Sequence, residues 1–192
     1  VDSDEMGLPV NAQLPPPTDP AEFVPADASV REVHEYGSVF VDTATGVGNA
    51  PVIVGEVWDP VFAGRMVILE GTVPARSDEA MVSPGLLERI GARIGDEVVL
   101  TESDTAFTIT GTMRQLDQHP SDDMLFLPET AADLVSAGAV RWFVADWQPD
   151  AAELTTLNHA GFVAYARDLV LDPPAGASSS SAMSAAAFWQ ML

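Results

Sequence analysis

One short loop carries most of the residue types that could bind a metal ion. Within the stretch DQHPSDDM the candidates are Asp117, His119, Asp122 and Asp123. Carboxylate oxygens and imidazole nitrogens are ligands for divalent cations. Their spacing matches neither the helical pattern of zinc proteases nor the ladder of an EF-hand loop. We therefore favour a polar loop between two strands, turned by Pro120, and keep the four residues as weak candidates for a metal site. No cofactor is expected.

Nucleophilic catalysis would need a serine, threonine or cysteine beside a base. The available bases are His34, His119 and His159. No serine lies in a nucleophile-elbow context, the serine run at 178–181 lies in a low-complexity segment, and the chain has no cysteine. The chain also has no lysine and no GxxxxGK[ST] motif, so it does not hydrolyse ATP by a P-loop mechanism. Neither a hydrolase triad nor P-loop ATP hydrolysis is therefore expected from these residues.

Asp78 and Glu79 form the other acidic pair that could act as acid and base. They stand at the beginning of the short apolar run EAMVS, which is typical of a strand. Because neighbouring residues of a strand point to opposite faces, we expect that the two carboxylates do not share one substrate. We interpret the pair as the solvated start of a strand.

The elements that position these residues belong to a strongly acidic chain. Of its 192 residues 47% are hydrophobic, and the formal net charge is −21, with eight Arg and no Lys. The apolar share is enough for a sizeable core. The charge repels phosphate backbones, so nucleic-acid binding is not expected, whereas a basic peptide or a divalent ion would be attracted. The simplest interpretation of the charge is a solvated surface that favours solubility.

The composition divides the chain into four segments. We expect a Pro-rich lead-in at 1–20, a core domain with room for two subdomains at 21–171, a linker rich in Ser, Gly and Pro at 172–184, and an apolar segment, AAAFWQML, at 185–192. The last segment is interpreted as the start of a membrane-proximal or transmembrane helix, or alternatively as a helix that packs on the domain. No window of the sequence reaches the roughly 18 apolar residues that a membrane span needs.

Apolar periodicity predicts the elements of the core. A short helix is expected from Asp27 to Glu35, and Gly55 is expected to mark a bulge or a close backbone contact. Further helices are expected at 84–91, 128–138 and 149–161. Strands are expected at 37–44, 50–59, 65–71, 79–83, 92–102, 106–114, 123–128, 139–147 and 162–171. Adjacent strands mixed with short helices indicate an α+β fold, with mixed β-sheet subdomains, rather than a doubly wound sheet.

Small residues punctuate this order. Pro84 suits the start of a helix, where its missing N–H costs nothing, and Gly91 suits the end of that helix. Gly95 and Asp96 predict a sharp turn into the next strand, because glycine permits a positive φ and aspartate bonds to nearby backbone N–H groups.

Taken together, these residues form an ordered string that resembles a known family. The string comprises Gly71, Pro74, Asp78-Glu79, Met81-Val82-Ser83, Leu86-Leu87, Gly91, Gly95-Asp96 with Val98, and Phe107 to Gly111. It is similar to the MacB-like periplasmic core domain of FtsX-type ABC transporter permeases, and the segment LFLP with the helix expected after it resembles the family's next part. The resemblance covers about residues 50–135, and its structural motif is Gly71, Asp78, Glu79, Gly91, Gly95, Asp96 and Gly111.

The resemblance implies a MacB periplasmic-core-like fold at the extracellular or periplasmic face of a bacterial membrane, tethered to the membrane in the full-length protein. It implies a cytoplasmic ABC ATPase subunit as partner and an extracellular protein as a second partner, for which the acidic charge of the chain makes a cationic peptide an alternative. The domain would couple ATP hydrolysis to export or to that second partner, and the family has no catalytic residues to carry over.

Two alternatives remain at this stage. One is a free-standing secreted binding or adhesion domain. The other is a cradle-loop β-barrel that binds a ligand. A barrel would need a closed strand order, and the helices expected after residue 128 fit such an order poorly.

Overall fold

The computed structural model describes residues 20–116, 118–119, 121–135, 139–164 and 166, without the side chain of Tyr36. The elements are η1 (Pro20–Glu22), β1 (Ser29–Thr43), β2 (Gly46–Val54), η2 (Pro60–Phe62), β3 (Met66–Gly71), β4 (Glu79–Val82), α1 (Pro84–Ile90), β5 (Glu97–Leu100), β6 (Thr105–Gln115), β7 (Leu125–Leu127), η3 (Glu129–Leu134), β8 (Ala139–Ala145) and α2 (Ala151–His159). The α+β class predicted from the sequence is confirmed. The expected linker, the terminal apolar segment and the lead-in apart from Pro20 lie outside the described residues.

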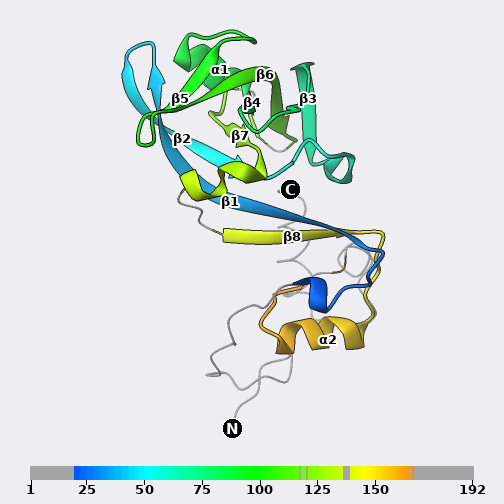
Figure 1. The fold of residues 1–192 in the computed structure, drawn as a ribbon. Helices are drawn as coiled ribbons and strands as arrows, with labels where there is room; N and C mark the ends of the chain where they lie inside the picture. The colour runs from blue at the N-terminus through cyan, green and yellow to red at the C-terminus, as the bar shows by residue number, and fades with distance from the viewer. Residues whose placement is uncertain (1–19, 117, 120, 136–138, 165, 167–192) are drawn as a thin grey trace. The chain divides into compact units, whose positions relative to one another are not determined.

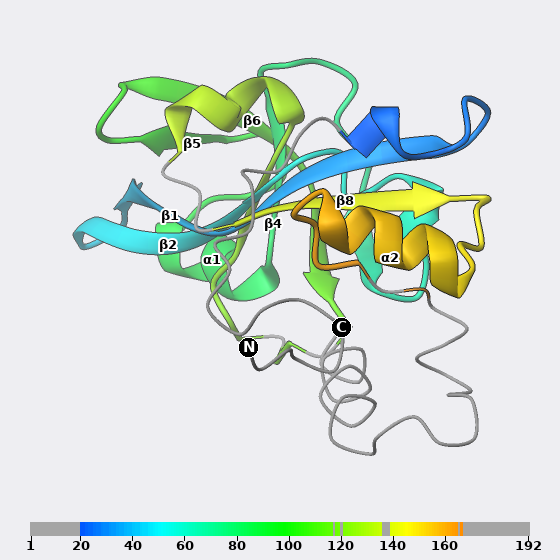
Figure 2. The ribbon, with the colours of Figure 1, turned by 90° about the horizontal axis from the view of Figure 1, so that it is seen from below.

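The chain divides into two compact units. One unit is residues 31–143, and the described part of the other is 20–30 with 144–164 and 166. The boundaries fall inside β1 and β8, so these two strands carry the chain into and out of the larger unit. β8 is hydrogen-bonded to β1 and lies beside it (Figure 1, Figure 2).

The sheet of the larger unit closes on itself. Its strands follow the order β2, β7, β4, β6, β5, β1, and β1 also pairs with β2, which completes a ring. The pairs β2–β7 and β4–β6 are parallel, and the other pairs of the ring are antiparallel. The junction between β1 and β5 is short, with Val41 opposite Leu100 and the Thr101 N–H donating to the Phe40 carbonyl at 2.8 Å.

The expectation that the helices after residue 128 fit a closed strand order poorly is therefore wrong. The helix expected at 128–138 is a short 3-10 turn, Glu129–Leu134, and residues 136–138 are not described. The helix expected at 149–161 is confirmed as α2, but it belongs to the other unit. Neither helix interrupts the ring of strands.

Apolar residues fill the inside of this ring. All six of its strands contribute to one cluster of buried side chains, and α1 adds Leu86. A second cluster takes alternate residues of three of these strands, Ile53 of β2, Met81 of β4 and Phe126 of β7. β4, β7 and the last three residues of β2 are thus buried on both faces, which explains why these stretches are continuous apolar runs rather than alternating ones. Each fully buried large side chain stabilises the fold by about 1.5–3 kcal/mol.

The helix expected at Asp27 to Glu35 is wrong, because this segment belongs to β1. Burial follows every second residue here: Val33, Glu35, Gly37, Val39 and Val41 are buried. That is the period of a strand. The alternation is not apparent in the sequence, because one of the buried positions is occupied by a carboxylate, that of Glu35.

The smaller unit has a well-capped helix. Asp150 accepts backbone hydrogen bonds from Ala152 at 2.8 Å and Glu153 at 2.9 Å, and the Glu153 carboxylate accepts from the Asp150 N–H at 2.8 Å, which forms a capping box. Phe162, after the helix, packs edge-to-face on Phe23 with ring centroids 5.8 Å apart. The strand expected at 162–171 is absent from its described residues, 162–164 and 166.

Candidate functional site

The two glycines that bound the motif string face each other across one strand pair. Gly71 in β3 is the register partner of Gly111 in β6. A Cβ on Gly71, which has a φ of +82°, would lie 2.3 Å from the Thr110 carbonyl oxygen. A Cβ on Gly111 would lie 2.5 Å from the Glu70 carbonyl oxygen. Because Gly111 also pairs with Met81 of β4, both glycines serve a backbone contact that a side chain would block.

Asp78 and Glu79 share a partner, contrary to the expectation that they point apart. The Arg76 guanidinium bonds to Asp78 at 2.9 Å and lies 3.3 Å from Glu79. Strand alternation does not separate them, because β4 begins only at Glu79. Glu79 also accepts the backbone N–H groups of Ala75 at 2.7 Å and of Arg76 at 3.1 Å, which closes the turn before β4.

Electrostatics fix the protonation states of this group. The hydrogen bond from Arg76 lowers the pKa of Asp78, and the bond to Asp78 raises the pKa of Arg76. An acid–base catalyst needs a pKa near the working pH. The arrangement is that of an ion-paired turn, with the carboxylate and the guanidinium both charged.

The remaining motif residues shape the ends of α1 and the turn into β5. Gly91 caps α1 with a φ of +72°. Gly95 has a φ of +99°, as expected, and its N–H donates to the Ile109 carbonyl at 2.7 Å. The Asp96 carboxylate accepts the Arg93 N–H at 2.9 Å, so it bonds backward along the chain rather than forward. These contacts place the turn against β6.

Ser83 joins the start of α1 to the acidic loop. Its hydroxyl accepts the Leu86 N–H at 3.2 Å and the Met124 N–H at 2.9 Å, and it donates to the Asp122 carbonyl at 2.6 Å. The side chain is buried. The helix signal in SPGLLERIG thus also fixes a loop almost forty residues further along the chain.

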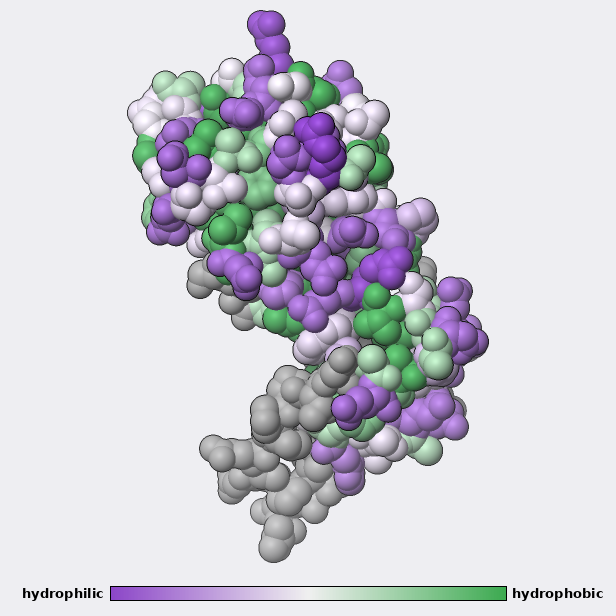
Figure 3. All heavy atoms as spheres, in the orientation of Figure 1, coloured by the Kyte–Doolittle hydropathy of each residue, from purple (hydrophilic) through white to green (hydrophobic). Residues whose placement is uncertain are grey.

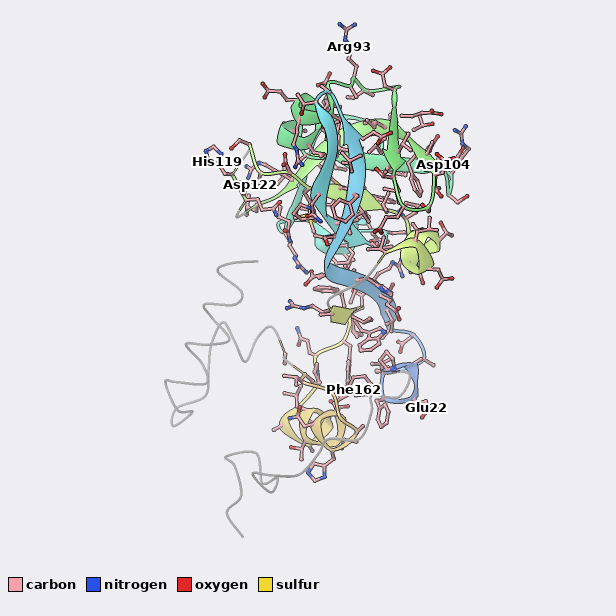
Figure 4. All side chains as sticks on the ribbon, turned by 90° about the vertical axis from the view of Figure 1, so that its left-hand side faces the viewer. Glu22, Arg93, Asp104, His119, Asp122 and Phe162 are labelled. Atoms are coloured by element: carbon pink, nitrogen blue, oxygen red, sulfur yellow. The ribbon has the colours of Figure 1, made fainter. Side chains whose placement is uncertain are left out.

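The structure uses the metal candidates for local contacts. The Asp122 carboxylate accepts the His119 N–H at 2.9 Å, and the two residues lie together in the loop before β7 (Figure 4). Asp123 pairs with Arg89, which also donates to the Asn49 carbonyl at 3.0 Å. Asp117 is not described. Among the residues that are described, no three His, Asp or Glu side chains are grouped as metal ligands would be.

One contact in this loop has the residue types of a nucleophile and a base. The His119 Nδ1 and the Ser121 Oγ are 2.7 Å apart on an exposed loop. A catalytic serine also needs a group that orients the base. In the part of the chain that is described, the acid beside His119 bonds to its backbone N–H and not to its ring.

Sequence reasoning missed a buried group of charges on β1, which we call the β1 ionic cluster: Glu35, Arg65 and Arg141. Glu35 is 3% exposed, and both arginines contact its carboxylate, Arg65 through Nη2 and Arg141 through Nε at 3.0 Å. The Arg65 guanidinium lies over the Phe143 ring, 4.8 Å from its centroid. The cluster ties β1 both to β8 and to the segment just before β3.

Polar contacts continue along β1 on either side of the cluster. Glu32 accepts a hydrogen bond from Trp142 Nε1 at 2.8 Å and contacts His34 Nε2 at 2.8 Å. Arg31 bonds to Asp59 at 2.9 Å. His34, one of the three bases considered from the sequence, is therefore part of this network. Val33, Val39 and Val41 have the spacing of one strand face, but the carboxylate of Glu35 interrupts this pattern, so the sequence contains no clear signal for the cluster.

Comparisons with known proteins return solved structures of low sequence identity to this chain. No family model and no curated protein matches the chain. Similar solved structures include a domain of a permease protein from Porphyromonas gingivalis (14% identity, TM-score 0.44, 72% of this chain and 86% of that chain). Another is the periplasmic region of MacB from Actinobacillus actinomycetemcomitans (12% identity, TM-score 0.47, 66% of this chain and 63% of that chain). A third is the extracellular domain of the noncanonic ABC-type transporter YknZ from Gram-positive bacteria (8% identity, TM-score 0.41, 66% of this chain and 69% of that chain).

These solved structures include the kind of domain that the sequence motifs resemble, at identities of 8–14% and TM-scores of 0.41–0.47. The match spans less than two thirds of the MacB region. Within the described residues, no helix is both long enough and apolar enough to cross a membrane.

Proposed function

We propose that this chain is an extracytoplasmic, non-catalytic domain of an FtsX/MacB-type ABC transporter permease. The observation that carries the proposal is the placement of the motif string. Its residues run in order through β3, β4, α1, β5 and β6, and these elements assemble around β6. Each motif residue has a folding role that the geometry explains, so the string describes this fold rather than an active site.

The architecture suits a part that transmits movement. The closed sheet, packed inside by apolar side chains, resists deformation because its strands have no free register. Only β1 and β8 carry the chain into and out of this unit, and the β1 ionic cluster fastens these two strands to each other. Movement reaching either strand would therefore act on the sheet as a whole, which is how ATP hydrolysis by a cytoplasmic partner would be coupled to export.

The closed strand order favours a second candidate, a cradle-loop β-barrel that binds a ligand. A ligand site inside the ring would need space, and the ring is filled by buried residues such as Val52, Leu100 and Ile109. Such a domain would therefore bind a ligand through the loops that connect its strands. This second candidate is compatible with the permease proposal, because a transporter domain can also bind its partner through loops.

The permease proposal is tested in the full-length gene product. We expect spans of roughly 20 apolar residues on both sides of the domain, and copurification with an ABC ATPase. Replacing residues 31–143 by a Gly-Ser linker should leave ATP hydrolysis in the purified complex but abolish export in cells. A full-length product that lacks either span, or that supports export without residues 31–143, contradicts the proposal.

A further inference from the structure

A surface groove of about 410 Å³ lies among three connecting segments of the larger unit. Glu56 and Trp58 follow β2, Pro74 and Arg76 precede β4, and Pro128 and Glu129 follow β7. The motif string does not account for this groove. Of the residues that line it, only Pro74 belongs to the string.

Strand direction places all three segments at one end of the sheet. β2 and β7 are parallel, so both end there, and β4 is antiparallel to β7, so it begins there. The Gly55 N–H donates to the Leu127 carbonyl at 2.9 Å, which holds the first and third segments together. Loops held by a rigid scaffold in this way are common binding surfaces.

The groove combines rigid apolar rings with acidic charge. Trp58, Pro74 and Pro128 contribute ring surfaces that lose little conformational entropy when a ligand binds, and Trp58 is anchored by packing on the second core cluster. The face seen in Figure 3 carries hydrophilic surface interspersed with hydrophobic patches.

The charge balance of the groove is negative. Arg76 is its cation, and this guanidinium already contacts both Asp78 and Glu79. Glu56 and Glu129 are exposed, and neither forms an ion pair within the described part of the chain. The lining thus holds two carboxylates, Glu56 and Glu129, and one guanidinium whose charge is already matched by Asp78 and Glu79 outside the lining. A ligand that brings positive charge and can lie on proline and tryptophan rings complements this surface.

From these features we infer that the groove binds a basic, extended segment of a partner protein. The partner's arginine or lysine side chains lie near Glu56 and Glu129, and its apolar or prolyl residues lie against Trp58, Pro74 and Pro128. The inference rests on the proposed function only for the source of the segment, an extracytoplasmic partner of the permease. Binding in the groove is a property of this chain and can be measured without the transporter.

The test uses the complete 192-residue chain and a fluorescein-labelled peptide of alternating Arg and Pro. Fluorescence anisotropy should show binding that weakens with salt, and an alternating Glu and Pro peptide should not bind. The double variant Glu56→Gln/Glu129→Gln should bind the basic peptide about five- to tenfold more weakly, because it loses two exposed charge contacts. Both residues are exposed, so the variant should fold normally.

The matched control is Glu88→Gln/Glu97→Gln, which changes the net charge by the same amount. Glu88 lies in α1 and Glu97 begins β5; both are exposed, and neither lines the groove. The control should bind within about twofold of the unsubstituted chain, because neither carboxylate lines the groove and exposed charges outside it are screened by salt. Equal weakening by both double variants would show only general attraction to an acidic surface and would overturn the inference. The inference would also be overturned if the amide chemical shifts that change on peptide addition belonged to residues outside 56–58, 74–77 and 128–130.

These results separate the two proposals. Loss of groove binding leaves the permease proposal standing, since that is decided by the flanking spans and the ATPase. Binding without those spans would instead support the free-standing binding domain.

Discussion

Replacing Glu35 by glutamine should destabilise the larger unit more than any other single removal of charge among the described residues. The side chain keeps its size but loses the negative charge that both Arg65 and Arg141 contact. Glu35 is 3% exposed, and Arg65 is 7% exposed, so water cannot replace the lost carboxylate. Arg65 is already short of partners: within the described residues its buried Nε and Nη1 make no hydrogen bond.

The expected magnitude follows from leaving buried charge without its partner. Breaking a buried ion pair by removing one member costs about 3–5 kcal/mol, and here two arginines lose the same carboxylate. A domain of this size is stable by about 5–15 kcal/mol, so the loss is a large part of the total. With a urea m-value of about 1–3 kcal/mol/M, the unfolding midpoint should fall by at least about 1 M.

Urea unfolding of the complete chain, followed by circular dichroism, measures this loss. The control is Glu32→Gln, a neighbour whose side chain is 38% exposed, which should cost about 1 kcal/mol or less. Replacing Glu35, Arg65 and Arg141 together by methionine should recover most of the stability, because no buried charge is then left without a partner. A Glu35→Gln variant within about 1 kcal/mol of the unsubstituted protein would refute the reasoning.

Three further predictions concern the turns and the acidic loop. In the same urea assay, Gly71→Ala should lower the free energy of unfolding by about 2 kcal/mol or more, because both the positive φ of Gly71 and the nearby Thr110 carbonyl oppose a Cβ. Gly95→Val should lower it by about 1 kcal/mol, from the positive φ alone, since no atom lies within 4 Å of a Cβ at that position. Equal or negligible losses for the two variants would contradict this account. The hydrogen bond from the Val61 N–H lowers the pKa of Asp59. The ionised Asp59 therefore stabilises the folded protein at any pH above its ordinary pKa, and this stabilisation is lost as the pH falls through the lowered pKa. An NMR titration of Asp59 with a midpoint at or above the ordinary pKa would contradict this prediction. Calorimetry with Ca²⁺, Mg²⁺ and Zn²⁺ should show no tight binding, and tight binding that disappears in Asp122→Ala would overturn the polar-loop interpretation.

Local signals in the sequence predicted the part of the fold between β3 and β6 well. Pro84 begins α1, Gly91 ends it, and Gly95 turns the chain with a positive φ. In each case one residue type satisfies a backbone requirement of its own position. The short apolar runs of β4 and β7 were also recognisable, because burial on both faces leaves no polar alternation.

The closure of the sheet could not be predicted in this way. The parallel pairing of β2 with β7 and the contact of Val41 with Leu100 join segments far apart in the sequence, and no local pattern encodes them. The β1 ionic cluster was hidden for a related reason. Glu35 looks like a surface residue until the partners that allow its burial, Arg65 and Arg141, are brought to it by the fold.

The shared contact of Asp78 and Glu79 with Arg76 shows a smaller limit. Strand alternation predicts opposite faces only if both residues lie in the strand, and β4 begins at the second of them. A shift of one residue in the boundary changes which side chains meet. The groove could likewise not be predicted from the sequence. Its lining comes from three separate segments, which only the folded sheet brings together at one end.

The side of the membrane on which this domain lies tests the central claim most directly. The chain has no cysteine, so a single Glu102→Cys substitution in the exposed turn between β5 and β6 gives one labelling site within the domain. The substituted full-length protein, expressed in its own cells, is treated as intact spheroplasts or protoplasts with a membrane-impermeant maleimide. The account predicts labelling before lysis, on a protein that sediments with the membranes and that remains unlabelled without the substitution. Labelling only after lysis, or on a protein that does not sediment with membranes, would contradict it.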